Sequence, residues 1–382
     1  RDLGITEVFG NPGSTELPLF RDFPDDFRYI LGLQESVVIG MADGYAQASR
    51  QAAFVNLHSS AGVGHALGNL FTAYKGQSPL VVTAGQQARS ILSYEPFLFA
   101  ERSTEFPRPF IKWACEPACA ADVPAAIARA YAIAMAPPRG PVFVSIPVDD
   151  WDQPAALIAP PVMLDDPAPG PGAITAARAR LEASKSPVIV AGPEIDRAGA
   201  WDSAVALAER LACPVWASPM SSRCSFPESH PQFAGFLRAD EASVFDALAP
   251  HDLALVIGAP AFTYHFENPA QRPLGAFVLH FTNDASTASY TRQGEIVLGD
   301  VGKAMDAMLT GLKPRPAFDG QARQKPAPIP AGALTTAAAI DLIQALRPKD
   351  ALIAEEAPSA RPEIQKRLRI DRPESFFATA SG

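Results

Sequence analysis

Cysteine is scarce in this sequence, and long apolar runs and clusters of positive charge are missing. Four cysteines in 382 residues are too few for a disulfide-rich secreted scaffold. No apolar stretch approaches the roughly 20 residues that a membrane-spanning helix needs, and no signal peptide begins the sequence. The net charge is −9, and lysines and arginines form no cluster, which argues against nucleic acid as a binding partner. We therefore expect a cytoplasmic protein with neither a membrane nor a nucleic acid as its partner.

The signatures of several common sites are missing as well. The spacing of Cys115 and Cys119 does not make a zinc site by itself. The sequence has no G-x-S-x-G nucleophile elbow and no Walker loop. The two glycines between His58 and His65 do not have the G-x-G-x-x-G spacing of a dinucleotide loop. We expect no metal ligands among residues 1–382.

Proline, by contrast, is abundant, with 38 residues. Two proline-rich stretches, 153–172 and 313–332, are predicted to be linkers. They divide the chain into domains at residues 1–152, 173–312 and 333–382. A chain of this length is expected to form two or three domains.

Strands and apolar helices alternate along the first two of these segments. This alternation predicts an α/β fold of consecutive doubly wound domains, each with a parallel sheet covered on both faces. Helices are expected at residues 36–49, 64–74 and 201–211. Strands are expected at residues 7–9, 27–30, 53–57, 80–84, 142–146, 188–191, 215–217, 253–257, 277–281 and 296–298.

The last segment shows only the opening of a third α/β unit. A helix is expected at residues 335–346 and a strand at residues 351–354, and a second helix would follow. The sequence begins at Arg1 without methionine and stops at Gly382 as a loop begins. We expect residues to be missing at both ends.

Glu35 opens the apolar helix expected at residues 36–49. A solvated carboxylate at a helix N-terminus commonly does no more than stabilise the helix dipole. This helix, however, is apolar or small for several turns, so we expect Glu35 to be buried. A buried carboxylate there could share a proton with a ligand nitrogen. The residue alone leaves both interpretations open.

Asn11, Pro12, Gly13 and Ser14 directly follow the first predicted strand. Pro-Gly predicts a type II turn, and Ser14 is predicted to cap a helix that begins near Thr15. The same helix N-terminus would attract an anion such as a substrate carboxylate. A plain turn with a cap explains these residues equally well.

Two histidines lie where predicted strands end. His58 follows a strand directly, at the position where open α/β sheets place ligands. His265 follows a later strand and a turn, and its aromatic neighbour Tyr264 suits the wall of an apolar pocket. His65 falls inside a predicted helix and His280 inside a predicted strand, so we expect both to be structural.

These stretches together resemble the thiamine-diphosphate-dependent decarboxylases. The similarity covers nearly the whole chain and is more specific than any single motif. It runs through Leu33-Gln34-Glu35 and Asn56-Leu57-His58-Ser59. The other matching stretches are residues 8–14, 42–49, 78–87, 140–147, 256–260 and 264–265.

The resemblance implies that thiamine diphosphate is the cofactor. Glu35 would contact its pyrimidine ring and help to activate it, with Asn11, Pro12, Gly13 and Gly382 beside the cofactor. The first domain would bind the pyrimidine ring, and the second would be a Rossmann-like middle domain. The third would bind the diphosphate through Mg²⁺, whose ligands are expected beyond Gly382. Active sites between subunits imply a homodimer or homotetramer.

The resemblance also implies the reaction, which is the non-oxidative decarboxylation of an aromatic or branched 2-oxo acid such as benzoylformate. Ser14 would hold the substrate carboxylate, and His58 and His265 would move protons to and from the intermediates. Phe97 and Leu98 would line the substrate pocket together with Ser14 and His265. Phe97 stands where the relatives have a leucine, which could reshape that pocket.

Two other functions remain open. An acetolactate-synthase-like carboligase usually has a Gly-Pro-Gly turn where this chain has residues 58–62, which argues against that activity. A non-catalytic homologue that lacks the diphosphate domain is the second alternative. Retention of Glu35, His58 and His265 argues against it, and the missing diphosphate domain argues for it.

Overall fold

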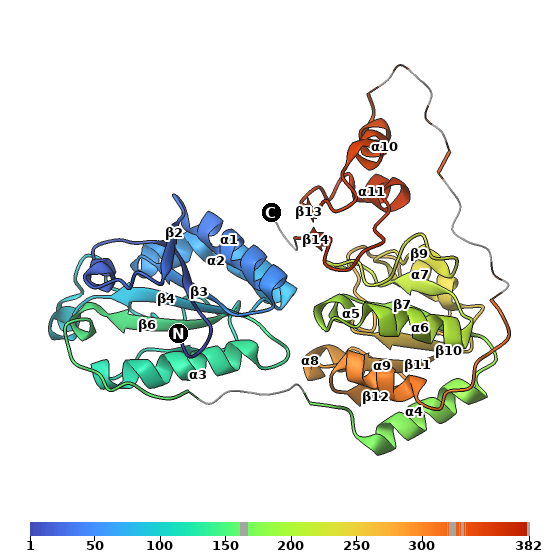
Figure 1. Ribbon diagram of the computed structural model, residues 1–382, viewed down its shortest axis with the longest axis horizontal. Coiled ribbons are helices and arrows are strands. Elements are labelled where there is room, and N and C mark those ends of the chain that lie inside the picture. Colours follow the sequence, from blue (N-terminus) through green and yellow to red (C-terminus); the bar gives the residue numbers. More distant parts are fainter. Residues whose placement is uncertain are drawn as a thin grey trace. The chain divides into compact units, whose positions relative to one another are not determined.

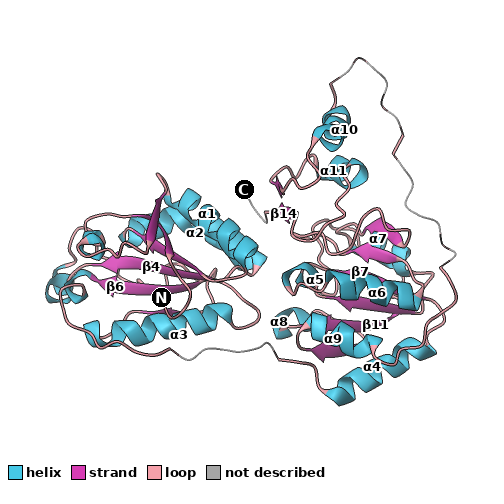
Figure 2. Ribbon diagram, in the orientation of Figure 1, coloured by secondary structure: helices cyan, strands magenta, loops and turns pink. Residues whose placement is uncertain are grey.

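The computed structural model describes residues 1–160, 167–318, 320, 326–327, 329, 332 and 334–379. These residues form two compact units, one within residues 1–165 together with Thr379 and one within residues 166–378. Each unit contains a six-stranded sheet with helices packed on it (Figures 1 and 2). The predicted α/β fold is therefore confirmed. In the described part of the chain, every helix is too short or too polar to cross a membrane.

The first unit is built on a sheet in which all neighbouring strands are parallel, in the order β2-β1-β3-β4-β6-β5. β1 pairs with β2 on one side and with β3 on the other, so the strand order reverses between β1 and β3. In open α/β sheets, ligands bind at the carboxyl ends of the strands beside such a reversal. The strands are β1 (Glu7–Asn11), β2 (Arg28–Leu31), β3 (Ala53–Leu57), β4 (Leu80–Gln86), β5 (Ala114–Cys115) and β6 (Val142–Pro147).

Helices cover both faces of this sheet (Figure 1). α1 (Glu35–Ser49) and α2 (Ser59–Gly76) pack together on one face, and α3 (Val123–Met135) packs on the other. Successive strand residues point to opposite faces, so Val82 of β4 joins the core under α1 and α2 while Val81 joins the core under α3. Strand β4 is buried along its whole length for this reason.

The second unit has a parallel sheet in the order β12-β11-β10-β7-β8-β9. Strands β7, β8 and β9 form one half of the sheet, and β10, β11 and β12 form the other, with β7 beside β10 at the centre. This is the strand order of a Rossmann fold. The Rossmann-like middle domain is therefore confirmed. The strands are β7 (Pro187–Ala191), β8 (Val215–Ala217), β9 (Phe233–Phe236), β10 (Leu253–Ile257), β11 (Phe277–Thr282) and β12 (Glu295–Leu298).

The helices of this unit divide between the two faces of the sheet. α4 (Pro171–Ala183), α6 (Trp201–Leu211) and α9 (Val301–Leu309) share one core. α7 (Glu241–Leu248) packs in a smaller core on the opposite face. The short helices α5 (Glu194–Arg197) and α8 (Ala285–Ala288) follow the ends of β7 and β11.

The C-terminal segment adds two helices and two short parallel strands to the second unit. Its small core contains Ile340, Leu368 and Ile370, and the half-buried Cys224 of the middle domain packs against it. The elements are α10 (Thr336–Leu346), β13 (Ile353–Glu355), α11 (Arg361–Arg367) and β14 (Phe376–Ala378).

A buried ion pair helps to hold this segment on the middle domain. Arg223 donates from Nη1 to Oδ2 of Asp196 at 3.0 Å, and these side chains are only 3% and 1% exposed. The other oxygen of Asp196 accepts the backbone N–H of Glu374 at 2.9 Å. The Arg223 guanidinium also lies 4.6 Å from the ring centre of Phe377. Both charged residues thus contact the C-terminal segment.

Most predicted elements are confirmed, and the errors lie at short strands and at helix starts. Strands β5, β9 and β14 were not predicted, because they are too short to show a periodic pattern. α2 begins at Ser59, not at residue 64, and α4 begins at Pro171, inside the predicted linker. Proline suits the first turn of a helix, since its missing N–H has no partner there.

His280 is structural, as predicted. It is fully buried in β11, where Nδ1 accepts from the Thr291 hydroxyl at 2.7 Å and Nε2 donates to the Ala259 carbonyl at 2.6 Å. Burial lowers the pKa of this imidazole, so the ring is held neutral.

Replacing Arg223 with leucine should destabilise the chain strongly. The change removes the hydrogen-bonded cation of a buried carboxylate, and we expect the free energy of unfolding to fall by about 3–5 kcal/mol. Urea denaturation of the whole chain, followed by tryptophan fluorescence, measures this. Arg272→Leu is the matched control, because Arg272 pairs with Asp246 on the exposed surface. Equal midpoints for the two variants would contradict the structural role of the buried pair.

Candidate active site

The predicted site residues of the first unit gather where β1 and β3 end. Asn11 is the last residue of β1, and His58 directly follows the last residue of β3. These strands flank the reversal of strand order, which is the position where α/β sheets bind ligands. The sheet topology therefore brings Asn11, Pro12, Gly13 and His58 to one edge.

Glu16, which the sequence analysis missed, lies at the centre of this edge. Its side chain is fully buried. Its carboxylate accepts the backbone N–H of Gly13 at 2.9 Å and that of Gly85 at 2.8 Å, and the Thr15 hydroxyl at 2.6 Å. Because the residues after β1 and at the end of β4 both donate to this one carboxylate, Glu16 ties those strand ends together.

His58 completes the contacts of this carboxylate. Its Nδ1 lies 2.7 Å from Oε2 of Glu16, and the imidazole is 24% exposed while Glu16 is 1% exposed. A carboxylate accepts hydrogen bonds only, so the pairing places the proton on Nδ1. Nε2 is then the nitrogen that can accept a proton from a ligand.

Two glycines make these contacts possible. A β-carbon at position 13 would lie 2.1 Å from Nδ1 of His58, and one at position 85 would lie 2.3 Å from Oε1 of Glu16. Both distances are far below van der Waals contact, so neither position accepts a larger residue without a shift. Gly13 is therefore needed for the close approach of the imidazole.

The predicted turn and cap at Gly13 and Ser14 are wrong in detail. Gly13 does not have the positive φ that a type II turn requires. Ser14 is exposed in a turn, and the helix that follows is a single 3-10 turn, Leu17–Phe20, without a side-chain cap. Glu16 and His58 dictate this geometry, because their contacts with Gly13 take precedence over the local turn preference.

Glu35 lies at the first position of α1 and is 7% exposed. Its Oε1 accepts from Nδ2 of Asn11 at 3.1 Å, and its Oε2 lies 3.1 Å from Nδ1 of His65. The buried positions of α1 recur every three or four residues from Glu35 onward, so the helix face that carries Glu35 is the buried one. His65 was expected to be purely structural, yet its ring contacts Glu35 directly.

The predicted substrate-pocket residues Phe97 and Leu98 lie in a turn of the segment between β4 and β5. Phe97 is completely exposed and Leu98 is half-buried in this unit. The buried Gln86 side chain fixes the backbone just beyond this turn. Its Nε2 donates to the Ala100 carbonyl at 2.9 Å, and its Oε1 accepts the Ala100 N–H at 3.2 Å.

Gln86 therefore connects two parts of the candidate site. Its neighbour Gly85 donates to Glu16, while Gln86 itself holds the turn of Phe97 and Leu98. The same segment is anchored further along, where Ser103 donates to Glu116 at 2.6 Å.

His265 belongs to the second unit, so the site residues are divided between the two units. It is exposed, and its ring packs edge-on against Phe266 with 4.7 Å between the ring centres. Its backbone N–H donates to the Ala239 carbonyl at 2.7 Å. Gly382, predicted to lie beside the cofactor, falls outside the described residues.

Comparison with known proteins identifies the family of this chain. The profile "Thiamine pyrophosphate enzyme, N-terminal TPP binding domain" matches residues 1–104, and the profile of the central domain of the same enzymes matches residues 174–308. Benzoylformate decarboxylase of Pseudomonas aeruginosa is 43% identical over 386 aligned positions, which cover 99% of this chain and 73% of that protein. This chain belongs to the thiamine-diphosphate-dependent enzymes.

Two further comparisons place this thiamine-diphosphate enzyme within its family. The solved structure of benzoylformate decarboxylase from Polynucleobacter necessarius matches with a TM-score of 0.97 at 38% identity, over 100% of this chain and 73% of that one. Acetolactate synthase isozyme 3 large subunit of Escherichia coli is 28% identical over 321 residues, covering 81% of this chain and 55% of that protein. The decarboxylases are thus the more similar of these relatives.

The residues present fit one part of the cofactor of this enzyme family. Glu35 offers a buried carboxylate whose position is set by Asn11 and His65. Such a carboxylate suits a hydrogen bond with a ring nitrogen of the cofactor. Gly62 lies close by, since a β-carbon there would be 3.3 Å from the Glu35 side chain. Among the described residues, no group of three His, Cys, Asp or Glu side chains could hold a metal ion.

Replacing Gln86 with leucine should loosen the segment that carries Phe97 and Leu98. The change removes both side-chain hydrogen bonds to Ala100, so we expect trypsin to cleave after Arg102 roughly tenfold faster. Mass spectrometry of the fragments measures the rate. Gln87→Leu, at the neighbouring half-buried position, should leave that rate unchanged. Equal cleavage of the two variants would show that Gln86 does not hold this segment.

Proposed function

We propose that this protein is a carboxy-lyase that decarboxylates an aromatic 2-oxo acid, with benzoylformate as the first candidate. One observation carries the proposal. The carboxylate of Glu35 and the His58–Glu16 pair lie on the same edge of the sheet, at the reversal of strand order. Family membership and the similarity to two benzoylformate decarboxylases support the same reaction class.

Glu35 would face the pyrimidine ring of thiamine diphosphate. When bound, this cofactor supplies a nucleophilic carbanion and an electron sink, which are the two functions that decarboxylation of a 2-oxo acid requires. Glu35 would share a proton with a ring nitrogen, and Asn11 and His65 orient its carboxylate for that contact. Asn11, Pro12, Gly13 and Gly382 would lie beside the cofactor. Mg²⁺ would bind the diphosphate through ligands other than the described residues.

His58 would move protons through Nε2. Its Nδ1 proton points at Glu16, which fixes the tautomer and the direction of the ring. Glu16 is a positioning residue here, because it acts on the substrate only through His58. Proton transfer by a ring fixed in this way avoids the loss of rate that a freely rotating imidazole would bring.

The remaining residues would bind the substrate. Ser14 is exposed next to Gly13, which contacts His58, and this suits a role in holding the substrate carboxylate. Phe97 and Leu98 would line the aryl pocket, and His265 would supply a second proton transfer. The family resemblance also leads us to propose a homodimer or homotetramer with active sites between subunits. The cytoplasmic location stays a prediction from the sequence.

The carboligase activity of the acetolactate synthases is the second candidate function. One of those relatives is 28% identical to this chain over 321 residues, which keeps the activity open. Incubation with pyruvate discriminates between the two functions, because a carboligase forms acetolactate and a decarboxylase releases an aldehyde. Formation of neither product, from pyruvate or from benzoylformate, would favour a non-catalytic homologue.

Replacing Glu35 with glutamine tests the proposed cofactor contact. The amide cannot share a proton with the ring nitrogen, so we expect carbon dioxide release from benzoylformate to be abolished. The assay supplies thiamine diphosphate and Mg²⁺, and circular dichroism verifies that the variant is folded. Glu101→Gln, an exposed position, is the control. Normal turnover by Glu35→Gln would refute the role. No release by a wild type that is shown to bind thiamine diphosphate and Mg²⁺ would refute the proposed substrate.

Replacing His58 with alanine should lower the rate of carbon dioxide release roughly 10²-fold, the usual contribution of a general acid or base. His230→Ala is a matched control. His230 also lies near a glutamate, with 3.4 Å between its Nε2 and Oε1 of Glu209, but it belongs to the second unit. An unchanged rate in His58→Ala would return this histidine to a structural role.

A further inference from the structure

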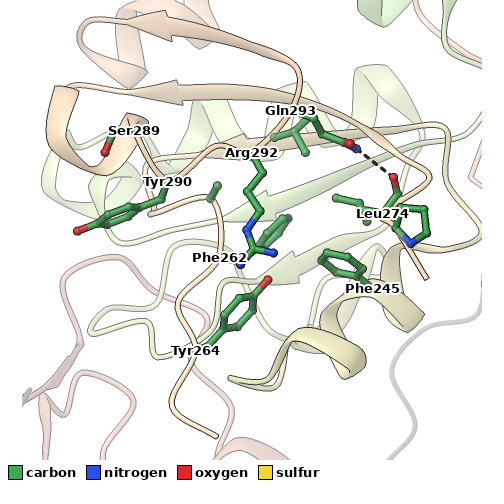
Figure 3. A pocket seen from close by; sticks show the side chains of 11 residues that line it. Phe245, Phe262, Tyr264, Leu274, Ser289, Tyr290, Arg292 and Gln293 are labelled. Carbon is green, nitrogen blue, oxygen red and sulfur yellow. Dashed lines mark hydrogen bonds between the residues drawn. The ribbon is translucent and has the colours of Figure 1, made fainter. Parts of the chain in front are cut away.

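A pocket in the second unit is not used by the proposed reaction. It has a volume of about 500 Å³ and lies against the face of the sheet on which α7 packs (Figure 3). Phe245 of α7, Phe262 and Tyr264 after β10, and Leu274 before β11 form its apolar wall. All four are partly buried side chains at the border of the core under α7. The pocket thus lies where helices leave this face of the sheet uncovered, and four of its eleven lining residues are aromatic.

Arg292 provides the positive charge of this pocket. Figure 3 shows its side chain pointing toward the hydroxyl of Tyr264. Its Nη1 donates to Oε1 of Glu241 at 2.5 Å. The described contacts of Arg292 use this one nitrogen, so the other guanidinium N–H groups remain available to a ligand.

Glu241 fixes the direction of the guanidinium. Its second oxygen accepts the Ala270 N–H at 3.0 Å, and this bond lowers the pKa of the carboxyl, as does the hydrogen bond from Arg292. The carboxylate therefore stays ionised and pairs with Arg292 at neutral pH, although the Arg292 side chain is 72% exposed. A ligand must share the guanidinium with Glu241, which limits how tightly it can bind.

The rim of the pocket is also held. Nε2 of Gln293 donates to the carbonyls of Leu274 and Ala276, at 3.0 Å and 2.8 Å. Figure 3 shows the first of these bonds beside the pocket. The segment that carries Arg292 is thus tied to the wall that faces it, so the two sides of the pocket keep their spacing.

We propose that this pocket binds an aromatic monocarboxylic acid. The ring would lie among Phe245, Phe262 and Tyr264, and the carboxylate would accept hydrogen bonds from Arg292. Apolar walls with one placed charge are typical of small-molecule sites, and arginine matches a carboxylate with two parallel N–H groups. The site belongs to a different unit from Glu35 and His58, and it needs neither cofactor nor metal. Tyr264 precedes His265, so a ligand would also order the backbone beside that histidine.

Titration of the whole chain with benzoate tests the pocket. Benzoate has the ring and the carboxylate but no ketone, so decarboxylation cannot consume it. We expect saturable binding by calorimetry and slower amide hydrogen exchange at residues 261–266. Benzamide, the uncharged isostere, should bind about tenfold more weakly, because its amide cannot replace the charge-assisted bonds. Equal affinity for the two ligands would overturn the assignment to a carboxylate.

Two variants and a control locate the binding. Arg292→Gln should weaken benzoate binding about tenfold or more, whereas Arg272→Gln, an exposed arginine paired with Asp246, should leave it unchanged. His58→Ala should also leave it unchanged, which separates this pocket from the proposed active site. Loss of binding in His58→Ala alone, or no saturable binding by the wild type, would overturn the proposal. Failure of the decarboxylation assay would not affect this titration.

Discussion

The buried carboxylate of Glu16 is the interaction on which the candidate site depends. A fully buried charge is costly unless hydrogen bonds surround it. Here the N–H groups of Gly13 and Gly85, the Thr15 hydroxyl and the ring of His58 all lie within hydrogen-bonding distance. The charge is satisfied only when the ends of β1, β3 and β4 are in their native positions. The same contacts that stabilise it also place His58 for proton transfer.

The strand end that Glu16 helps to fix also holds the segment of the proposed substrate pocket. Gly85 and Gln86 are consecutive at the end of β4, and one donates to Glu16 while the other holds the backbone at Ala100. A rigid strand end therefore carries both the proton-handling pair and the turn of Phe97. Functional groups supported by packed strands are positioned more accurately than groups on free loops.

The second unit uses buried charge in a different way. Asp196 and Arg223 neutralise each other, and both contact the segment after the middle domain. Near the pocket, Glu241 and Arg292 form a pair at the surface, where the guanidinium can still reach a ligand. The difference in burial explains the two roles. The buried pair Asp196–Arg223 helps to hold the fold, whereas the more exposed pair Glu241–Arg292 can exchange one partner for a ligand.

Local patterns were enough to predict the α/β class, most strands, helix α6 to the residue, and the positions of Glu35 and His58 at element ends. Hydrophobic periodicity and strand-end position are properties of neighbouring residues, so a sequence reveals them. Glu16 could not be found in this way, because its partners come from positions 13, 58 and 85 and meet only through the order of the strands. Only the tertiary structure decided the turn at Gly13 and the contact of His65 with Glu35. Each of these depends on which distant segments the sheets bring together, and no local preference encodes that.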